Sequence, residues 1–323
     1  MASAEGHSRP SASPGARRGS DAENANPTIR QRELGIRLRE LRNARGLTVE
    51  DVAELIMVSA TKISRLETAK RRASLRDVRD LCRVYGVAGQ AEIDELMDLA
   101  RQAREPGWWT RYEDLNLSPF IGLEQEAVAI TSFSMYYVPP LLQTGDYARA
   151  MITGIARRMD ANVLAERVEV RLQRQSLLER EPPPRYRAII DEAVLRRQVG
   201  GSQVMGAQLE KLLQCVADDM ATVQVLPFDL GAYGAADSNF DLLEFGEGSP
   251  QNPVVFVEGL FSNIYLERPD QIGRYREAIE YLRDAALSPR DSMGIISKIR
   301  ADYATLAEAD LLTGNLPGVR NSR

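Results

Sequence analysis

The sequence predicts two domains of different class: an all-α domain of five helices over residues 28–104, and a mixed α+β domain with a largely antiparallel sheet over residues 105–306. Three observations support this. Residues 28–104 repeat apolar side chains at the three- and four-residue spacing of amphipathic helices. Residues 222–267 contain short β-rich runs separated by Gly, Pro, Asn and Asp. The 323 residues are enough for two domains with separate cores.

The two ends of the sequence differ from these domains in composition. Residues 1–27 are rich in Ser, Ala, Pro, Gly and Arg with almost no bulky apolar side chain, so we expect a disordered tail. They lack the apolar segment of a secretory signal, and no apolar run approaches the ~20 residues of a membrane span. Residues 307–323 are expected to form a flexible tail. These features predict a cytoplasmic protein.

Each predicted helix of the first domain combines an apolar stripe with a recognisable end. The first is predicted from Thr28 to Ala44, and Gly46 suits a left-handed cap. Two short helices joined by a tight turn are predicted within residues 47–66, followed by helices at 74–85 and 90–104. We expect four arginines on the outer face of the first helix: Arg37, Arg39, Arg42 and Arg45.

The two short helices have the pattern of a helix-turn-helix. Thr48, with Asp51, is placed to cap the first, and Ser59 to cap the second. Ile63 and Leu66 point to the core, so small, hydroxyl-bearing and cationic side chains point outward, as a major-groove helix requires. Any small helical hairpin shares this spacing, but the caps and a following basic run agree with it. The predicted DNA-contacting residues are Thr48, Ser59, Ala60, Thr61, Lys62, Ser64, Arg65, Lys70, Arg71 and Arg72.

Residues 47–67 resemble the xenobiotic-response-element class of helix-turn-helix regulators. The resemblance rests on Leu47-Thr48, Val52-Ala53, Val58-Ser59 and Ile63-Ser64-Arg65-Leu66-Glu67. Met57 stands where this class usually has Gly, so the turn either avoids a positive φ or bears strain. Val49 stands where the class often has a phosphate-contacting Gln.

Charge divides unevenly along the chain. Residues 28–85 hold 14 Lys and Arg against 8 Asp and Glu, whereas residues 86–323 hold 24 against 35. This division is typical of a protein whose basic first domain binds a polyanion, while the acidic remainder of the chain is repelled by it. The expected partner is a double-stranded DNA operator.

Catalytic chemistry finds little support. The single histidine, His7, lies in the predicted tail, so histidine triads and histidine metal sites are not expected in the folded domains. Cys82 and Cys215 each fall in a helical pattern and are expected to be small buried hydrophobes. The carboxylate doublets at 191–192 and 218–219 diverge on a strand or helix, so neither is a ready acid–base pair. We expect no enzymatic activity and no cofactor.

Residues 104–115 interrupt the helical pattern. Pro106 and Gly107 stop the helix, and Trp108 and Trp109 stand side by side with Tyr112 close behind. These aromatics suit either a wall for a ligand or a seal between two domains. We favour the seal.

The second domain mixes both periodicities. Helices are predicted at residues 146–155, 162–181, 203–217, 269–287 and 289–306, and the triple proline at 182–184 ends the second of them. Extended segments are predicted at residues 127–138, 186–191, 222–226, 240–245, 254–258 and 263–267. The close succession of the last four predicts an antiparallel meander.

A set of ordered motifs in this domain resembles a known family. The motifs are Gly107-Trp108-Trp109, the residues 138–144 with 146–150, and the residues 191–197, 223–228 and 257–260. They are similar to the large C-terminal domain found behind helix-turn-helix modules in many actinomycete regulators of development and secondary metabolism. The resemblance implies an antitoxin-like protein paired with a very small partner protein encoded by an adjacent gene.

Three functions remain open. The first is a sequence-specific transcriptional regulator, a homodimer acting at the nucleoid, whose C-terminal domain docks the small partner through an open strand edge and the flexible loop 231–237. The second is a one-component regulator whose C-terminal domain senses a small-molecule ligand, through Trp108 and Trp109. The third, an enzyme tethered to DNA, has the least support.

Overall fold

A computed structural model describes residues 29–104, 108–109, 117–156, 158–234, 238–247, 249, 251–259 and 262–313. The predicted tail at residues 1–27 and the aromatic Tyr112 lie outside the described residues, as do residues 235–237 of the predicted loop. No helix within these ranges combines the length and the apolar composition needed to cross a membrane.

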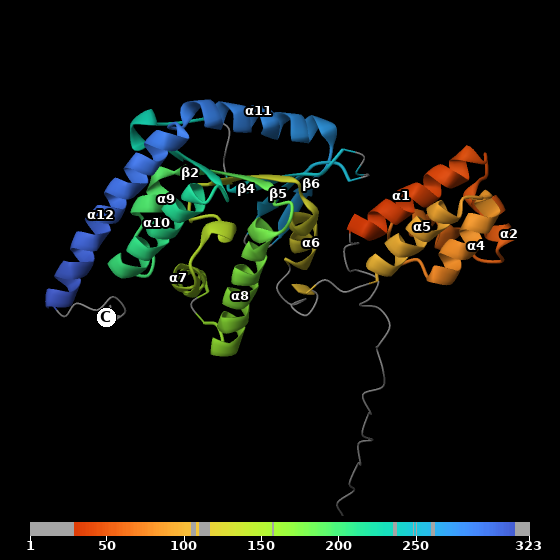
Figure 1. The fold of residues 1–323 in the computed structure, drawn as a ribbon, viewed down its shortest axis with the longest axis horizontal. Helices are drawn as coiled ribbons and strands as arrows, with labels where there is room; N and C mark the ends of the chain where they lie inside the picture. Colours follow the sequence, from red (N-terminus) through yellow and green to blue (C-terminus); the bar gives the residue numbers. More distant parts are fainter. Residues whose placement is uncertain are drawn as a thin grey trace, which may run out of the picture.

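The five helices predicted for the first domain are present (Figure 1). They are α1 Ile29–Ala44, α2 Val49–Leu55, α3 Ala60–Glu67, α4 Leu75–Tyr85 and α5 Gln90–Gln102. Their apolar stripes meet in one core, and Cys82 packs there as a small hydrophobe, as predicted. The fully buried centre of this core contains Leu38, Val52, Ile63, Leu81 and Leu96.

Two arginines predicted on the outer face of α1 instead bind across the domain. Arg45 donates from Nε and Nη2 to the carbonyls of Tyr85 and Gly86, at 2.5 and 2.9 Å. Arg42 reaches the carboxylate of Glu67 at the end of α3. Arg45 is exposed, as predicted, although its guanidinium is bound. The outward prediction is wrong for Arg42, which is largely buried, because a helix pattern does not reveal an acidic partner 25 positions away.

The second domain is α+β, with one mixed sheet of six strands in the order β3-β2-β1-β4-β5-β6. The strands are β1 Ala129–Ser134, β2 Arg185–Asp191, β3 Thr222–Leu226, β4 Phe240–Glu244, β5 Val254–Glu258 and β6 Asn263–Leu266. Three of the pairings are antiparallel, and β4, β5 and β6 form three of the four strands predicted for the meander. The prediction is wrong for β3, which lies at the opposite edge of the sheet beside β2. The strands β1, β2 and β3 pair in parallel instead. Helical crossovers join them, and parallel strands require such long connections.

The helices of this domain include two that the sequence pattern did not predict, α6 and α9. The full set is α6 Ser118–Glu126, η3 Pro140–Leu142, α7 Gly145–Ile155, α8 Ala161–Arg174, η4 Gln175–Glu179, α9 Glu192–Arg196, α10 Ser202–Ala217, η5 Phe228–Leu230, α11 Pro269–Ala285 and α12 Pro289–Thr313, where η marks a 3-10 helix. Pro119 near the start of α6 is a helix-start signal, but Gly122 weakens its helical pattern. The helix α9 spans a single turn and a half, too short for a periodic signal.

Two predicted helix ends need correction. The helix predicted to end at residue 181 divides, because α8 stops at Arg174 and the chain tightens into η4. The last helix, α12, continues to Thr313, so residues 307–313, predicted as part of a flexible tail, are helical. Residues 314–323 lie outside the described residues.

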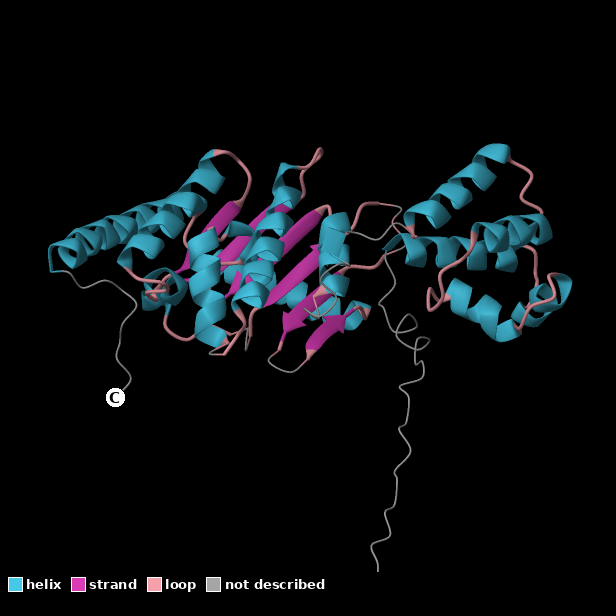
Figure 2. Ribbon diagram, turned by 90° about the horizontal axis from the view of Figure 1, so that it is seen from below, coloured by secondary structure: helices cyan, strands magenta, loops and turns pink. Residues whose placement is uncertain are grey.

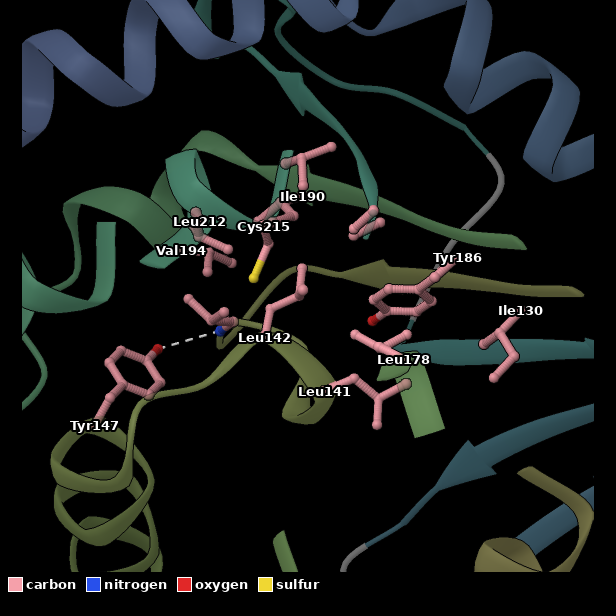
Figure 3. Close-up of a cluster of buried hydrophobic side chains, with 14 of the residues drawn as sticks. Ile130, Leu141, Leu142, Tyr147, Leu178, Tyr186, Ile190, Val194, Leu212 and Cys215 are labelled. Carbon is pink, nitrogen blue, oxygen red and sulfur yellow. Dashed lines mark hydrogen bonds between the residues drawn. The ribbon is translucent and has the colours of Figure 1, made fainter. Parts of the chain in front are cut away.

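Helices cover both faces of the sheet (Figure 1). The helix α11 lies along one face, over a core that includes Phe133, Ile189 and Leu282. The helices α7, α8 and α10 lie on the other face, which Figure 2 views from their side. Figure 3 shows part of this larger core, where the hydroxyl of Tyr147 on α7 accepts a hydrogen bond from the amide of Val138 at 3.2 Å. Cys215 packs in the same core.

The two domains meet through polar contacts of α1. Arg32 Nη1 donates to Oε1 of Glu267 at 3.0 Å and to Oε1 of Gln251 at 3.2 Å. Arg30 Nη2 lies 3.4 Å from Oε2 of Glu126 on α6. The first turn of α1 is therefore attached to both α6 and the segment that flanks β6.

The tryptophan pair follows the first domain in the chain and contacts the second. The rings of Trp108 and Trp109 meet edge to face with centroids 5.9 Å apart. The ring of Trp109 packs on α6, where a Cβ added to Gly122 would come within 3.4 Å of it. These contacts attach the pair to the second domain, and the sealing role stays a prediction.

Candidate nucleic-acid interface

The helix α3 has one buried side and one exposed side. Ile63, Leu66 and Glu67 are buried, whereas Thr61, Ser64 and Arg65 are exposed. Ala60 is half-buried and packs partly against the core. The exposed side therefore presents two hydroxyls and one guanidinium, the groups predicted to meet base edges.

Both predicted caps are present. The hydroxyl of Thr48 accepts a hydrogen bond from the amide of Asp51, whose carboxylate accepts one from the amide of Thr48. Ser59 Oγ accepts from the amide of Lys62 at 3.2 Å. Thr48 and Ser59 thus fix where α2 and α3 begin, and both are exposed beside the candidate interface. Val49, at the position of the expected Gln, packs partly against the core.

The turn between α2 and α3 adopts a positive φ without glycine. Met57 has φ of 54°. Its amide donates to the carbonyl of Glu54, and the amide of Val58 donates to the carbonyl of Ala53. These two bonds form a Schellman motif with Met57 at the left-handed position. Of the two possibilities raised by the sequence, the strained one is observed.

The close packing of α3 against α1 depends on a glycine. A Cβ added to Gly35 would lie 2.7 Å from the carbonyl oxygen of Glu67 and 2.8 Å from that of Leu66. Real Cβ atoms do not approach backbone so closely, so a side chain here would displace the end of α3. Gly35 therefore allows the two helices to touch through their backbones.

A buried ion pair fixes the same contact. Arg42 donates from Nε and Nη2 to the two carboxylate oxygens of Glu67 at 2.7 and 2.9 Å, and from Nη1 to the carbonyl of Leu47 at 2.7 Å. The hydrogen bond to Glu67 raises the pKa of Arg42, although burial opposes this. Because the pair is bidentate, it sets the rotation of α3 as well as its distance from α1.

The basic run after α3 forms an ordered turn. Ala69 is buried with φ of 56°, and its carbonyl accepts from Nε2 of Gln31 on α1. The amide of Arg71 donates to the carbonyl of Arg65 at 3.0 Å. The side chains of Lys70, Arg71 and Arg72 are all exposed beside the end of α3. A turn anchored by the buried Ala69 thus presents three cations on the side where phosphates would flank the groove.

The predicted contact residue Lys62 is engaged by α4. Lys62 Nζ forms an ion pair with Oδ1 of Asp77 on α4, and both side chains are largely buried. Burial opposes ionisation of Asp77, but hydrogen bonds from Lys62 and Ser74 outweigh it and hold the pKa of this carboxyl below its usual value. Lys62 therefore joins α3 to α4, and much of its charge is neutralised.

Sequence reasoning missed the residues that position the interface. They are Gln31, Gly35, Arg42, Glu67 and Asp77. Asp77 had a local signal, because it completes a capping box with Ser74 like that of Thr48. Glu67 lies within the motif that carries the family resemblance. The others act through contacts distant in sequence, for which periodicity gives no signal.

Comparison with known proteins identifies both domains. A family model described as "Domain of unknown function (DUF5753)" matches residues 117–298, more than half of the chain. The chain belongs to this family. A second model, described as "Helix-turn-helix domain", matches residues 33–96, which span most of α1 through part of α5. No curated protein and no solved structure matches the chain. The N-terminal domain is thus a helix-turn-helix DNA-binding domain of a regulator, and this family's description assigns no role to the C-terminal domain.

Proposed function

We propose that this protein is a sequence-specific transcriptional regulator that reads its operator with α3. The observation that carries the proposal is the exposed side of α3, with Thr61, Ser64 and Arg65, next to the ordered turn of three exposed cations. A helix docked by its apolar side and flanked by cations fits a major groove between phosphates.

The exposed residues have different roles in this proposal. Arg65 is the candidate for a bidentate contact with guanine. Arg71 and its two neighbours contact phosphates, which gives affinity without sequence preference. Lys62 is an accessory contact, because Asp77 already neutralises much of its charge.

The test starts from operators selected out of a random DNA pool. Arg65→Ala should cost about 1–3 kcal/mol of binding free energy and relax the preference at one base pair. Arg71→Ala should weaken all sequences alike and reduce the salt slope by about one. Arg290→Ala, at an exposed position of α12, is the matched control and should change neither. If both variants keep full affinity and specificity, α3 does not read the groove.

We also propose that the protein binds DNA as a homodimer on a palindromic or directly repeated site. One α3 reads only a few base pairs, too few for a unique genomic site, and a pair of helices one helical turn apart is the usual solution. Mass measurement of the protein–operator complex tests this. A single chain on an asymmetric half-site would contradict it.

The C-terminal domain is the proposed docking site of a small partner protein, and β6 is the strand edge that supports it. At the other edge, the amide of Val225 on β3 donates to Ser292 Oγ and its carbonyl accepts from the amide of Leu287, so that edge is partly covered. On β6, Ile264 is 49% exposed, and the following Glu267 binds Arg32 of α1. A strand added to β6 would therefore lie beside the DNA-binding domain.

Titration of the purified adjacent-gene product into a regulator–operator complex tests the partner proposal. A hundredfold change in DNA affinity corresponds to about 2.7 kcal/mol of coupling. Ile264→Asp should abolish the effect but leave DNA binding by the regulator alone intact. Partner binding with no change in DNA affinity would mean a complex without regulation, and the proposal would then be withdrawn.

Ligand sensing is the second candidate function, and a polar cavity at the carboxyl end of β1 favours it. Trp108 and Trp109 do not line that cavity, so the ligand site that we propose differs from the one that the sequence suggested at the tryptophans. We propose no catalytic activity, because Asp191 caps α9 and Glu192 accepts from the amide of Phe228. The proposed place of action remains the nucleoid.

A further inference from the structure

A cluster of charged side chains lies at the carboxyl end of β1 in the C-terminal domain. The strand β1 is where the sheet changes direction, since its parallel neighbour β2 follows it in the chain and the antiparallel β4 returns on its other side. Crevices at such positions are frequent ligand sites, because the connections leave in opposite directions there. Two adjoining hollows of about 30 and 100 Å³ are present. One ordered water needs only about 10–15 Å³, so a molecule of several non-hydrogen atoms fits.

The two hollows share Arg171, Arg174, Glu258 and Leu117 in their lining. Arg174 forms a bidentate pair with Glu124 of α6, to which it donates from Nε and Nη2 at 2.8 and 2.7 Å. Its guanidinium also lies 5.2 Å from the centroid of Phe120. Arg174 lines both hollows, and the charge of its guanidinium is already matched by the buried carboxylate of Glu124.

Arg171, one turn earlier on α8, differs from Arg174. Within the described residues it makes a single side-chain hydrogen bond, from Nη1 to the neutral Oε1 of Gln143 at 3.1 Å. A guanidinium has five N–H donors, so most of its capacity is left for a ligand. Burial and the nearby charge of Arg174 lower the pKa of Arg171, which means that the site favours an added anion.

Two carboxylates also line the cavity. Asp241 on β4 accepts from Ser132 Oγ, and Glu258 on β5 accepts from the hydroxyl of Tyr137 at 3.1 Å. Burial raises the pKa of Asp241 to about 7. An added cation would stabilise its ionised form. The cavity thus has a cationic wall from α8 and an acidic wall from β4 and β5.

We propose that this cavity binds a small zwitterion of the α-amino acid type, with its carboxylate on Arg171 and its ammonium group on Asp241 and Glu258. A bidentate carboxylate–guanidinium contact matches the free donors of Arg171. A simple anion would bring no counter-charge for Asp241 and Glu258, and a simple cation would bring none for Arg171. A zwitterion brings both.

The helix α6 connects this cavity with the DNA-binding domain. Phe120 of α6 lines the cavity, Glu124 holds Arg174, and Glu126 in the last turn of α6 contacts Arg30 of α1. Trp109 packs on the same helix. Ligand binding is therefore expected to change tryptophan fluorescence. An effect of the amino acid on DNA affinity rests on the proposed function, whereas binding of the amino acid to the cavity does not.

Calorimetric titration of the full chain tests the site. The probes are the protein amino acids one at a time, with acetate, methylamine and inorganic phosphate as single-charge comparisons. At least one amino acid should bind saturably and alter tryptophan fluorescence, and the single-charge probes should bind about tenfold more weakly or not at all. Failure of every amino acid to bind, or equally tight binding of phosphate or acetate, would overturn the proposal.

Variants locate the binding. Arg171→Gln and Glu258→Gln should each weaken it about tenfold or more, whereas Arg290→Gln on α12 should not. Glu258 is exposed, so its variant tests the site even if Arg171→Gln fails to fold. Unchanged binding in Glu258→Gln and in a folded Arg171→Gln would place the ligand elsewhere and overturn the proposal. The affinity of the protein for its operator, measured without any amino acid, tests the proposed function separately from the ligand site.

Discussion

At the scale of single residues, Met57 shows the cost of a turn built without glycine. Its φ of 54° lies in the left-handed region, and its side chain is 91% exposed. A left-handed backbone costs an L residue about 1–2 kcal/mol. Glycine avoids this cost, but it destabilises the fold by about 0.4–1 kcal/mol because it raises the conformational entropy of the unfolded chain. Met57→Gly should therefore stabilise α2 and α3 by about 0.5–1 kcal/mol, measured by amide hydrogen exchange in the full chain. Met57→Ala keeps the Cβ and should give no gain. A loss of protection in the glycine variant would mean that the exposed side chain stabilises the turn.

Asp77 is the residue through which acid should loosen the interface. The pKa of Asp77 is lower in the folded chain than in the unfolded chain. The ion pair with Lys62 therefore stabilises the fold fully above the pKa of the unfolded chain, which is about 4. This stabilisation is lost as the pH falls through the pKa of the folded chain. Asp77→Asn keeps the cap and should cost about 1.5 kcal/mol at neutral pH. That difference should shrink to nothing at strongly acid pH. Calorimetry of the full chain over pH measures it, with the exposed Asp98→Asn as control. A difference that did not depend on pH would exclude ionisation of Asp77 as its cause.

At the scale of elements, the distance between α1 and α3 is set by Gly35. An added methyl would meet two backbone carbonyls, which cannot rotate away, so Gly35→Ala should cost about 1–3 kcal/mol of stability as an overpacked contact. It should also weaken operator binding, because α3 must shift. Gly294→Ala is the matched control: it lies in α12 with no atom within 4 Å of the added Cβ, and it should stabilise by up to about 1 kcal/mol through helix propensity. Normal stability and DNA binding in the Gly35 variant would show that α3 does not depend on this contact.

The elements also show what the sequence alone can predict. Thr48, Ser59 and their helices were predictable because caps and apolar spacing act within one turn. The bond between Arg42 and Glu67 spans 25 positions, and the parallel pairing of β1 with β2 spans more than 50. Neither leaves a local pattern. The cavity at Arg171 escaped prediction for the same reason, since α6, α8, β4 and β5 meet there only after folding.

At the scale of the whole molecule, the domains are joined by partly exposed polar contacts. The side chains of Arg32 and Glu267 are 23% and 41% exposed, and those of Arg30 and Glu126 are 40% and 35% exposed. Such pairs contribute about 0–1 kcal/mol each and weaken with salt. The domain arrangement is therefore sensitive to small changes at α6 and β6, where a ligand or a partner is proposed to act.

Arg32→Ala should loosen this arrangement without unfolding either domain. It removes the hydrogen bonds to both Gln251 and Glu267, and neither of these is part of a hydrophobic core. Small-angle scattering should give a larger radius of gyration than for the wild type at low salt, and a smaller difference at high salt, where screening already weakens the wild-type pair. Arg37→Ala is the control, because Arg37 also lies on α1 but pairs with Glu92 and Glu95 inside the helical domain. Identical scattering from both variants and the wild type would show that Arg32 does not hold the domains together, and coupling through α1 would lose its structural basis.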